Sequence, residues 1–223
     1  MPTEKMVTIA SLHGFPMFAQ LSLDQLQSVA QLAKMRTVAR HEFVVTRGEP
    51  IDNVYLVLAG SLKVTVSDEE GREVILSMLG PGEIFGEVGV IDENPRSASV
   101  VALENSNVIV IAQEDFKRCM RENFDIALYV MRKLAQRLRS ADQKIESLAL
   151  MDVYGRVARQ LLDMATATNG EMVIKQKVSK QDMAKMIGAS REMVSRVMKD
   201  LHTRGFIEEG AGKMILHEHI GHF

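Results

Sequence analysis

Residues 124–151 repeat apolar side chains with a period of seven, and no other feature constrains the fold as strongly. Apolar residues occupy every a and d position of this repeat. They are Phe124, Met131, Leu138 and Ile145 at a, and Ala127, Leu134, Ala141 and Leu148 at d. A stripe of this width is typical of a long helix that pairs with a partner helix, so it predicts the seam of a homodimer. The alternative is a helix packed on its own domain, since some of these residues could do both.

Residues 37–112, before this repeat, have the character of a strand-rich domain. Runs such as 54–58, 62–66 and 108–111 are rich in Val, Ile and Leu, and turn signals rich in glycine separate them. Many short strands at near-regular spacing are typical of a small roll or barrel. A short amphipathic helix is predicted ahead of them, over residues 21–34.

After the repeat, Asp152 is a plausible N-cap for a helix that runs to about Ala167. A short strand pair is predicted over residues 171–178. Near the C-terminus, residues 205–207 and 214–216 flank a glycine-rich turn at 210–212, which predicts a β-hairpin. We therefore expect three domains: 1–115 as the roll with its leading helices, 116–151 as a dimerisation helix, and 152–223 as a C-terminal domain of helices and a hairpin.

Residues 179–201 have the pattern of a helix-turn-helix. Ser179 caps a helix that ends at Gly188, and Ser190 caps a second helix. Projected at roughly 100° per residue, this second helix separates an apolar side from a hydrogen-bonding side. Arginine and carboxylate groups on such a side can read guanine and cytosine in the major groove. The candidate DNA-binding residues are Ser179, Lys180, Ser190, Arg191, Glu192, Ser195, Arg196 and Lys199. The alternative without a role in DNA binding is a solvated helix with a Glu192–Arg196 ion pair.

Composition narrows the function classes. The single cysteine, Cys119, cannot supply the thiolates of an iron–sulfur cluster, and the sequence contains no nucleophile elbow, metal-ligand pair or P-loop. We therefore expect no catalytic residues, no metal and no covalent cofactor, and the protein is predicted not to be an enzyme. Apolar runs near the N-terminus are too short for a signal peptide or a membrane span, so a cytoplasmic protein without membrane contact is expected.

The segment 82–98 is the most unusual in the strand-rich region. Glu87 lies among apolar residues, where a carboxylate needs donors, and Gly86 permits close approach of the backbone to a ligand. Arg96 and Ser97 offer a charged fork, a hydroxyl and a backbone N–H to a phosphate. Two interpretations remain open: a cradle for a phosphorylated ribose, and a structural ion pair between Glu87 and Arg96.

The roll, long helix and helix-turn-helix together resemble the cyclic AMP receptor protein and fumarate–nitrate regulator (CRP/FNR) family. The segments 85–89 and 95–98 are similar to the phosphate-binding cassette of that family, and 190–196 is similar to its recognition helix. The resemblance implies an α+β fold with an N-terminal cyclic-nucleotide-binding β-roll (a jelly roll), a dimerisation helix and a C-terminal winged helix-turn-helix.

The resemblance also implies roles for individual residues. Glu87 would take the ribose hydroxyl of a cyclic nucleotide, and Arg96 with Ser97 its phosphate. Arg191, with Glu192 and Arg196, would read a palindromic operator in double-stranded DNA with TGTGA-like half-sites. The remaining cassette positions are Gly86, Val88 and Ala98. RNA polymerase is a further candidate partner, as for other transcription regulators.

One departure from the family concerns the base of the nucleotide. Where cyclic AMP binders use Thr and Ser to contact adenine, this chain has Ala141 and Asp142. Ala141 offers no hydrogen bond, whereas Asp142 can accept one from an amine of adenine or guanine. Cyclic AMP is the expected effector. The alternatives are cyclic GMP, cyclic di-GMP, no nucleotide at all, and a haem sensor that uses Cys119 or a histidine.

Overall fold

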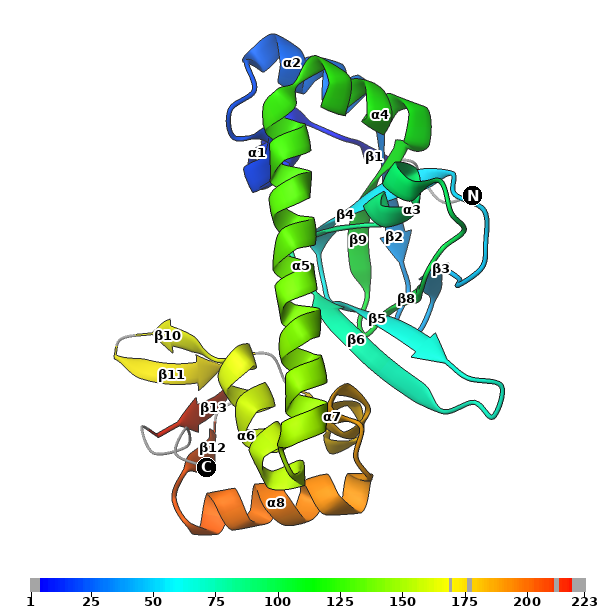
Figure 1. Cartoon of the computed structure of the whole chain (residues 1–223). Coiled ribbons are helices and arrows are strands. Elements are labelled where there is room, and N and C mark those ends of the chain that lie inside the picture. Colours follow the sequence, from blue (N-terminus) through cyan, green and yellow to red (C-terminus); the bar gives the residue numbers. More distant parts are fainter. Residues whose placement is uncertain (1–4, 169, 176–177, 211–212, 218–223) are drawn as a thin grey trace. The chain divides into compact units, whose positions relative to one another are not determined.

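The computed structural model describes residues 5–168, 170–175, 178–210 and 213–217 (Figure 1). The chain forms two compact units, Met1–Arg137 and Leu138–Phe223. The helices are α1 (Ile9–His13), η1 (Pro16–Phe18), α2 (Leu23–Leu32), α3 (Glu87–Asp92), α4 (Gln113–Glu122), α5 (Phe124–Leu150), α6 (Val153–Met164), α7 (Lys180–Ile187) and α8 (Arg191–Thr203). Among the described residues, no helix has both the length and the hydrophobicity needed to cross a bilayer.

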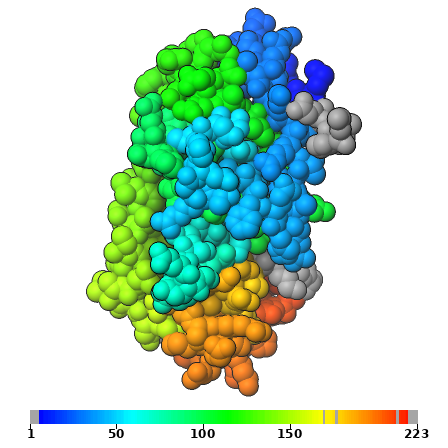
Figure 2. All heavy atoms as spheres, turned by 90° about the vertical axis from the view of Figure 1, so that its right-hand side faces the viewer, coloured from blue at the N-terminus to red at the C-terminus, as the bar shows by residue number. Residues whose placement is uncertain are grey.

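The first unit is a roll of two antiparallel sheets. One sheet has the order β1-β2-β9-β4-β7 and the other the order β3-β8-β5-β6. The strands are β1 (Lys5–Met6), β2 (Ala33–Val38), β3 (Phe43–Val45), β4 (Asn53–Ala59), β5 (Leu62–Ser67), β6 (Glu73–Leu79), β7 (Ile84–Phe85), β8 (Ser99–Ala102) and β9 (Ser106–Ala112). In the space-filling view, residues of this unit, in blue to turquoise, form part of one face of the molecule (Figure 2). The predicted α+β class and N-terminal roll are thereby confirmed.

Strand β4 explains why this region has continuous apolar runs rather than a strict alternation. Val54 and Leu56 face the helices of the first unit, whereas Tyr55 and Val57 face the interior between the sheets. Successive side chains of a strand point to opposite faces, so a strand covered on both faces needs apolar residues at every position.

The predicted helix after residue 116 is two helices. Helix α4 ends at Glu122, Asn123 adopts an extended backbone, and α5 begins at Phe124. Phe116 of α4 and Ile126 and Val130 of α5 are buried in the core that covers the outer face of the β2-β9-β4 sheet. The first turns of α5 therefore belong to the roll.

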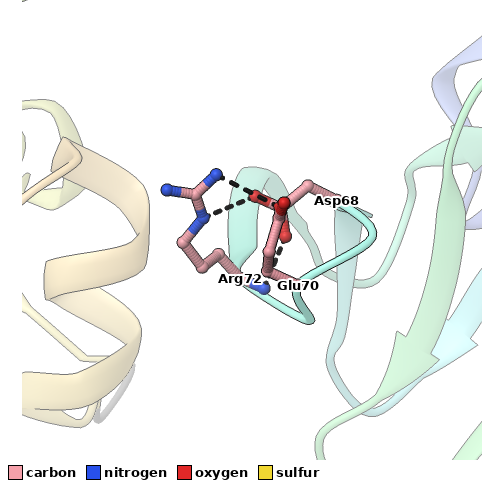
Figure 3. Close-up of polar contacts among 3 residues, drawn as sticks. All are labelled: Asp68, Glu70 and Arg72. Atoms are coloured by element: carbon pink, nitrogen blue, oxygen red, sulfur yellow. Dashed lines mark hydrogen bonds and ion pairs between the residues drawn. The ribbon is translucent and has the colours of Figure 1, made fainter.

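A polar turn closes the hairpin between β5 and β6 (Figure 3). The Arg72 guanidinium donates to Asp68 at 2.6 Å and to Glu70 at 3.3 Å, and the Arg72 backbone N–H donates to Asp68 at 2.8 Å. This exposed hairpin end is held by side-chain bonds to its own turn, which accounts for the charged sequence between two apolar strands.

The second unit contains α6, α7, α8 and the sheet β10-β11-β13-β12. Its strands are β10 (Thr166–Thr168), β11 (Glu171–Ile174), β12 (Ile207–Gly210) and β13 (Lys213–Leu216). Asp152 caps α6 by accepting from the Gly155 N–H at 2.8 Å, as predicted. The predicted hairpin of β12 and β13 is confirmed, although residues 211–212 of its turn lie outside the described part of the chain.

Within residues 171–178, where a strand pair was predicted, the described part contains one strand, β11, which pairs with β10 and β13 instead. Two predicted helices also end early, and one short helix was not predicted. Helix α2 ends at Leu32 instead of residue 34, because residues 33–38 pair with β9 along their whole length. Helix α6 ends at Met164 instead of Ala167, because Thr166–Thr168 pairs with Glu171–Ile174. The short helix α3 was not predicted at all. For α2 and α6, pairing of the following residues with a strand outweighs local helix propensity.

Candidate nucleotide and DNA sites

The candidate nucleotide site begins at Gly86, between β7 and α3. Gly86 has a left-handed backbone with φ of 84°. A Cβ at this position would lie 2.6 Å from Nη1 of Arg96 and 3.3 Å from the Asn53 carbonyl oxygen. Glycine is required here for two reasons, since an L side chain disfavours this φ and no room exists for it. The close approach places the backbone of the cassette against the guanidinium.

Arg96 lies buried under this turn, with only 5% of its surface exposed. Its Nη1 donates to the Gly86 carbonyl at 3.0 Å, and its Nη2 donates to the Asn53 carbonyl at 2.7 Å and to the Asp52 carboxylate at 3.0 Å. The guanidinium carbon lies 5.8 Å from the centre of the Tyr55 ring. Three carbonyl or carboxylate partners therefore fix a cation with five N–H donors, which leaves donors for an anion.

Glu87, the first residue of α3, is fully buried. Its Oε1 accepts from Nη1 of Arg137, and the second nitrogen of Arg137 donates to the Ile84 carbonyl. Arg137 lies on α5 within the first unit. Sequence reasoning missed it as a site residue, although it stands beside the seam at position 138 and a buried carboxylate calls for a cation.

The other carboxylate oxygen of Glu87, Oε2, has no hydrogen-bond donor among the described residues. Burial raises the pKa of Glu87 above its usual range, and the Arg137 guanidinium partly opposes this. An unsatisfied buried acceptor costs about 1–3 kcal/mol, so the site is incomplete by itself. A hydroxyl donor placed at Oε2 would satisfy it.

The structural alternative, an ion pair between Glu87 and Arg96, is wrong. Glu87 pairs with Arg137, and Arg96 pairs with Asp52. The two predicted residues are nevertheless brought together, because Arg96 contacts the carbonyl of Gly86 next to Glu87.

The other predicted ligand residues lie as follows. Ser97 is exposed beside Arg96, and Val88 and Ala98 are half-buried. Ala141 and Asp142 are exposed on the part of α5 that belongs to the second unit.

The helix-turn-helix is formed as predicted. Ser179 caps α7 by accepting from the Asp182 N–H at 3.0 Å, Gly188 ends α7 with φ of 63°, and Ser190 caps α8 by accepting from the Met193 N–H at 3.2 Å. Val194 and Leu201 of α8 are fully buried.

The other side of α8 presents its polar groups to solvent. Arg191, Glu192, Arg196 and Lys199 are exposed. The pKa of Glu192 is lowered by its own backbone N–H at the start of the helix and by the Ser190 hydroxyl. Met193 differs from the prediction: it belongs to the apolar side but is 41% exposed, because it lies at the edge of the buried face.

The predicted seam of α5 presents an apolar row to solvent in the single chain. Its a positions, Phe124, Met131, Leu138 and Ile145, are each between 49% and 69% exposed. Leu134, at a d position, is half-buried and packs against the core of the roll. One side of the first turns of α5 therefore covers the roll, as the second alternative expected, while the pairing of the open row with a partner helix stays a prediction.

The described residues also bear on a metal site and on a haem site. No group of three His, Cys, Asp or Glu side chains there is placed to hold a metal ion. Cys119 is buried in the apolar core, and burial raises the pKa of its thiol, which disfavours the thiolate form that ligates iron.

Comparisons with known proteins agree with this arrangement. Residues 35–123 match the family model of the cyclic nucleotide-binding domain, and residues 155–219 match that of the Crp-like helix-turn-helix domain. A relative from Mycobacterium tuberculosis, named a CRP-like cAMP-activated global transcriptional regulator, is 31% identical over 181 residues, which cover 79% of this chain and 81% of the relative.

Two solved structures share the fold. FixK2 from Bradyrhizobium japonicum has a TM-score of 0.74 and 25% identity, covering 83% of this chain and 93% of its own. The c-di-GMP responsive regulator CLP from Xanthomonas campestris has a TM-score of 0.72 and 24% identity, covering 88% and 99%. With both domain models matched in this order, the chain belongs to the CRP family of cyclic-nucleotide-binding, DNA-binding transcription regulators.

Proposed function

We propose that the protein is a homodimeric regulator that binds cyclic AMP in its roll and then binds a palindromic operator with TGTGA-like half-sites. The observation that carries the nucleotide part is Oε2 of Glu87, which is buried without a donor. A ribose 2′-hydroxyl supplies that donor. The remaining N–H groups of Arg96, with the hydroxyl and N–H of Ser97, are suited to the cyclic phosphate.

Arg137 is assigned a positioning role in this proposal. It pairs with Oε1 of Glu87, which orients the carboxylate and leaves Oε2 for the ligand. Because Arg137 lies on α5, a nucleotide that moves the Glu87 carboxylate also moves a side chain of the helix that carries the predicted seam. This connection provides a route for a shift between two conformational populations with different DNA affinity.

The exposed a-position row of α5 supports the homodimer. Side chains of this size at four successive a positions are costly to leave in water and are suited to a parallel partner helix. A dimer presents two copies of α8, whose arginines can reach half-sites about 34 Å apart in successive major grooves. Within this proposal the chain from Met151 to Val153, between α5 and α6, is the hinge, and residues 152–223 are the DNA-binding domain.

The identity of the nucleotide rests on relatives and on Asp142. The Mycobacterium tuberculosis relative is named as cAMP-activated, whereas the structurally similar Xanthomonas protein is described as c-di-GMP responsive. Cyclic GMP is the second candidate effector, because Asp142 can accept from the N1 and N2 hydrogens of guanine.

Calorimetric titration of the full chain with cyclic AMP, cyclic GMP and cyclic di-GMP tests the assignment. Saturable binding of cyclic AMP that Glu87→Ala abolishes is expected, and preference for either other nucleotide would correct the effector. Operator binding is then measured with and without the nucleotide that binds. Equal affinity for a palindromic duplex in both conditions would remove the allosteric part of the proposal.

A further inference from the structure

The second unit contains a cavity of about 460 Å³ between its helices and its sheet. The wall is apolar and comes from four directions, with Leu161 on α6, Ile174 on β11, Met183 on α7 and Met198 on α8. Small-molecule sites typically enclose about 300–1,000 Å³ and are lined mainly by apolar side chains. This cavity therefore has the size and lining of a ligand site, and it is separate from the nucleotide cassette of the first unit.

Charged side chains also line the cavity. Lys180 begins α7, and Lys213 and Glu209 lie on the strands of the hairpin. All three residues are exposed, and neither lysine forms an ion pair with another described residue. Two ammonium groups against one carboxylate leave a net positive charge at an apolar cavity, which favours an occupant with a single negative charge.

We propose that this cavity binds an amphiphile with an apolar chain and one carboxylate, of the class of medium-chain fatty acids. The apolar chain of the amphiphile lies among the methionines of the cavity, whose flexible thioethers adapt to occupants of different shape. The carboxylate lies between Lys180 and Lys213, whose stems line the cavity while their ammonium groups reach solvent.

The position of the cavity couples it to DNA reading. Val194 and Met198 line the cavity from the buried side of α8, and the opposite side of that helix carries the arginines. Lys180 is also one of the candidate DNA-binding residues. An occupant that takes Lys180 and presses on α8 competes with operator DNA, and by linkage DNA weakens the occupant by the same factor.

The test is a fluorescence titration of the full chain with 11-(dansylamino)undecanoic acid, whose emission rises in an apolar environment. One saturable site per chain is expected. The methyl ester of the probe should bind less tightly than the acid, and Lys213→Gln should weaken the acid about two- to fivefold, as for a partly solvated charge pair. Lys175→Gln is the matched control, because Lys175 is exposed in the same unit but does not line the cavity.

Two further measurements locate the probe. Met214→Trp, on the half-buried wall, should abolish binding by filling the cavity, with folding checked by thermal unfolding and by retained nucleotide binding. Cyclic AMP should not displace the probe. Displacement by the nucleotide, equal binding of acid and ester, or unchanged binding by a folded Met214→Trp variant would each overturn the proposal.

Discussion

Replacing Gly86 with alanine should disable nucleotide binding while leaving most of the fold intact. The added Cβ meets Nη1 of Arg96 at 2.6 Å and the Asn53 carbonyl oxygen at 3.3 Å. The guanidinium is the softer of these two neighbours, so it moves. Its displacement breaks the 3.0 Å bond to the Gly86 carbonyl and shifts the cation that the phosphate requires.

The magnitude has two parts. An alanine at a left-handed φ of 84° costs roughly 1–2 kcal/mol in stability, partly offset by about 0.4–1 kcal/mol from reduced freedom of the unfolded chain. Losing a hydrogen bond to a charged group costs about 1.5–3 kcal/mol more. If the ligand loses a comparable interaction with Arg96, nucleotide affinity falls roughly 10- to 100-fold.

The matched control is Gly71→Ala, in the turn of the β5–β6 hairpin. Gly71 has a similar φ of 79°, but no atom lies within 4 Å of its would-be Cβ. Urea unfolding should show a stability loss of at most about 2 kcal/mol for Gly71→Ala and a larger loss for Gly86→Ala. Calorimetry should show full nucleotide affinity for Gly71→Ala only. A Gly86→Ala variant that binds nucleotide as tightly as the parent would refute the placement of Arg96 at the phosphate.

Three further predictions concern the carboxylate, the DNA interface and the seam. Burial raises the pKa of Glu87, so the folded state binds a proton there more readily than the unfolded chain does, and nucleotide affinity should fall as the pH drops through that pKa. Glu87→Gln should raise the midpoint of thermal unfolding at neutral pH while weakening nucleotide binding. Calorimetry and melting curves at several pH values check both results. Arg196→Ala should cost about 1–3 kcal/mol of operator affinity and relax preference at one base pair in a gel-shift series, whereas a uniform loss over all sequences would show a phosphate contact instead. Ile145→Asp should shift sedimentation towards the monomer without unfolding the chain, because this side chain is 65% exposed, and an unchanged dimer would exclude the a-position row as the seam.

Local patterns were sufficient for the elements whose signals act over a few residues. The caps at Asp152, Ser179 and Ser190 were predicted correctly, because each hydroxyl or carboxylate satisfies an N–H only three positions away. The buried and exposed faces of α8 also followed from helical periodicity, apart from Met193 at the edge.

Contacts between distant residues had to come from the folded chain. Helix α2 stops early because the distant strand β9 pairs with residues 33–38. Helix α6 stops early because the strand that follows, β11, pairs with residues 166–168. The sequence suggested that Glu87 and Arg96 share one site, and the structure adds that Arg137, 50 positions away, is the cation that pairs with Glu87. A sequence pattern shows that a buried charge needs a partner, but only the packing of α5 on the roll decides which cation reaches it, since burial makes that pairing a property of the whole unit.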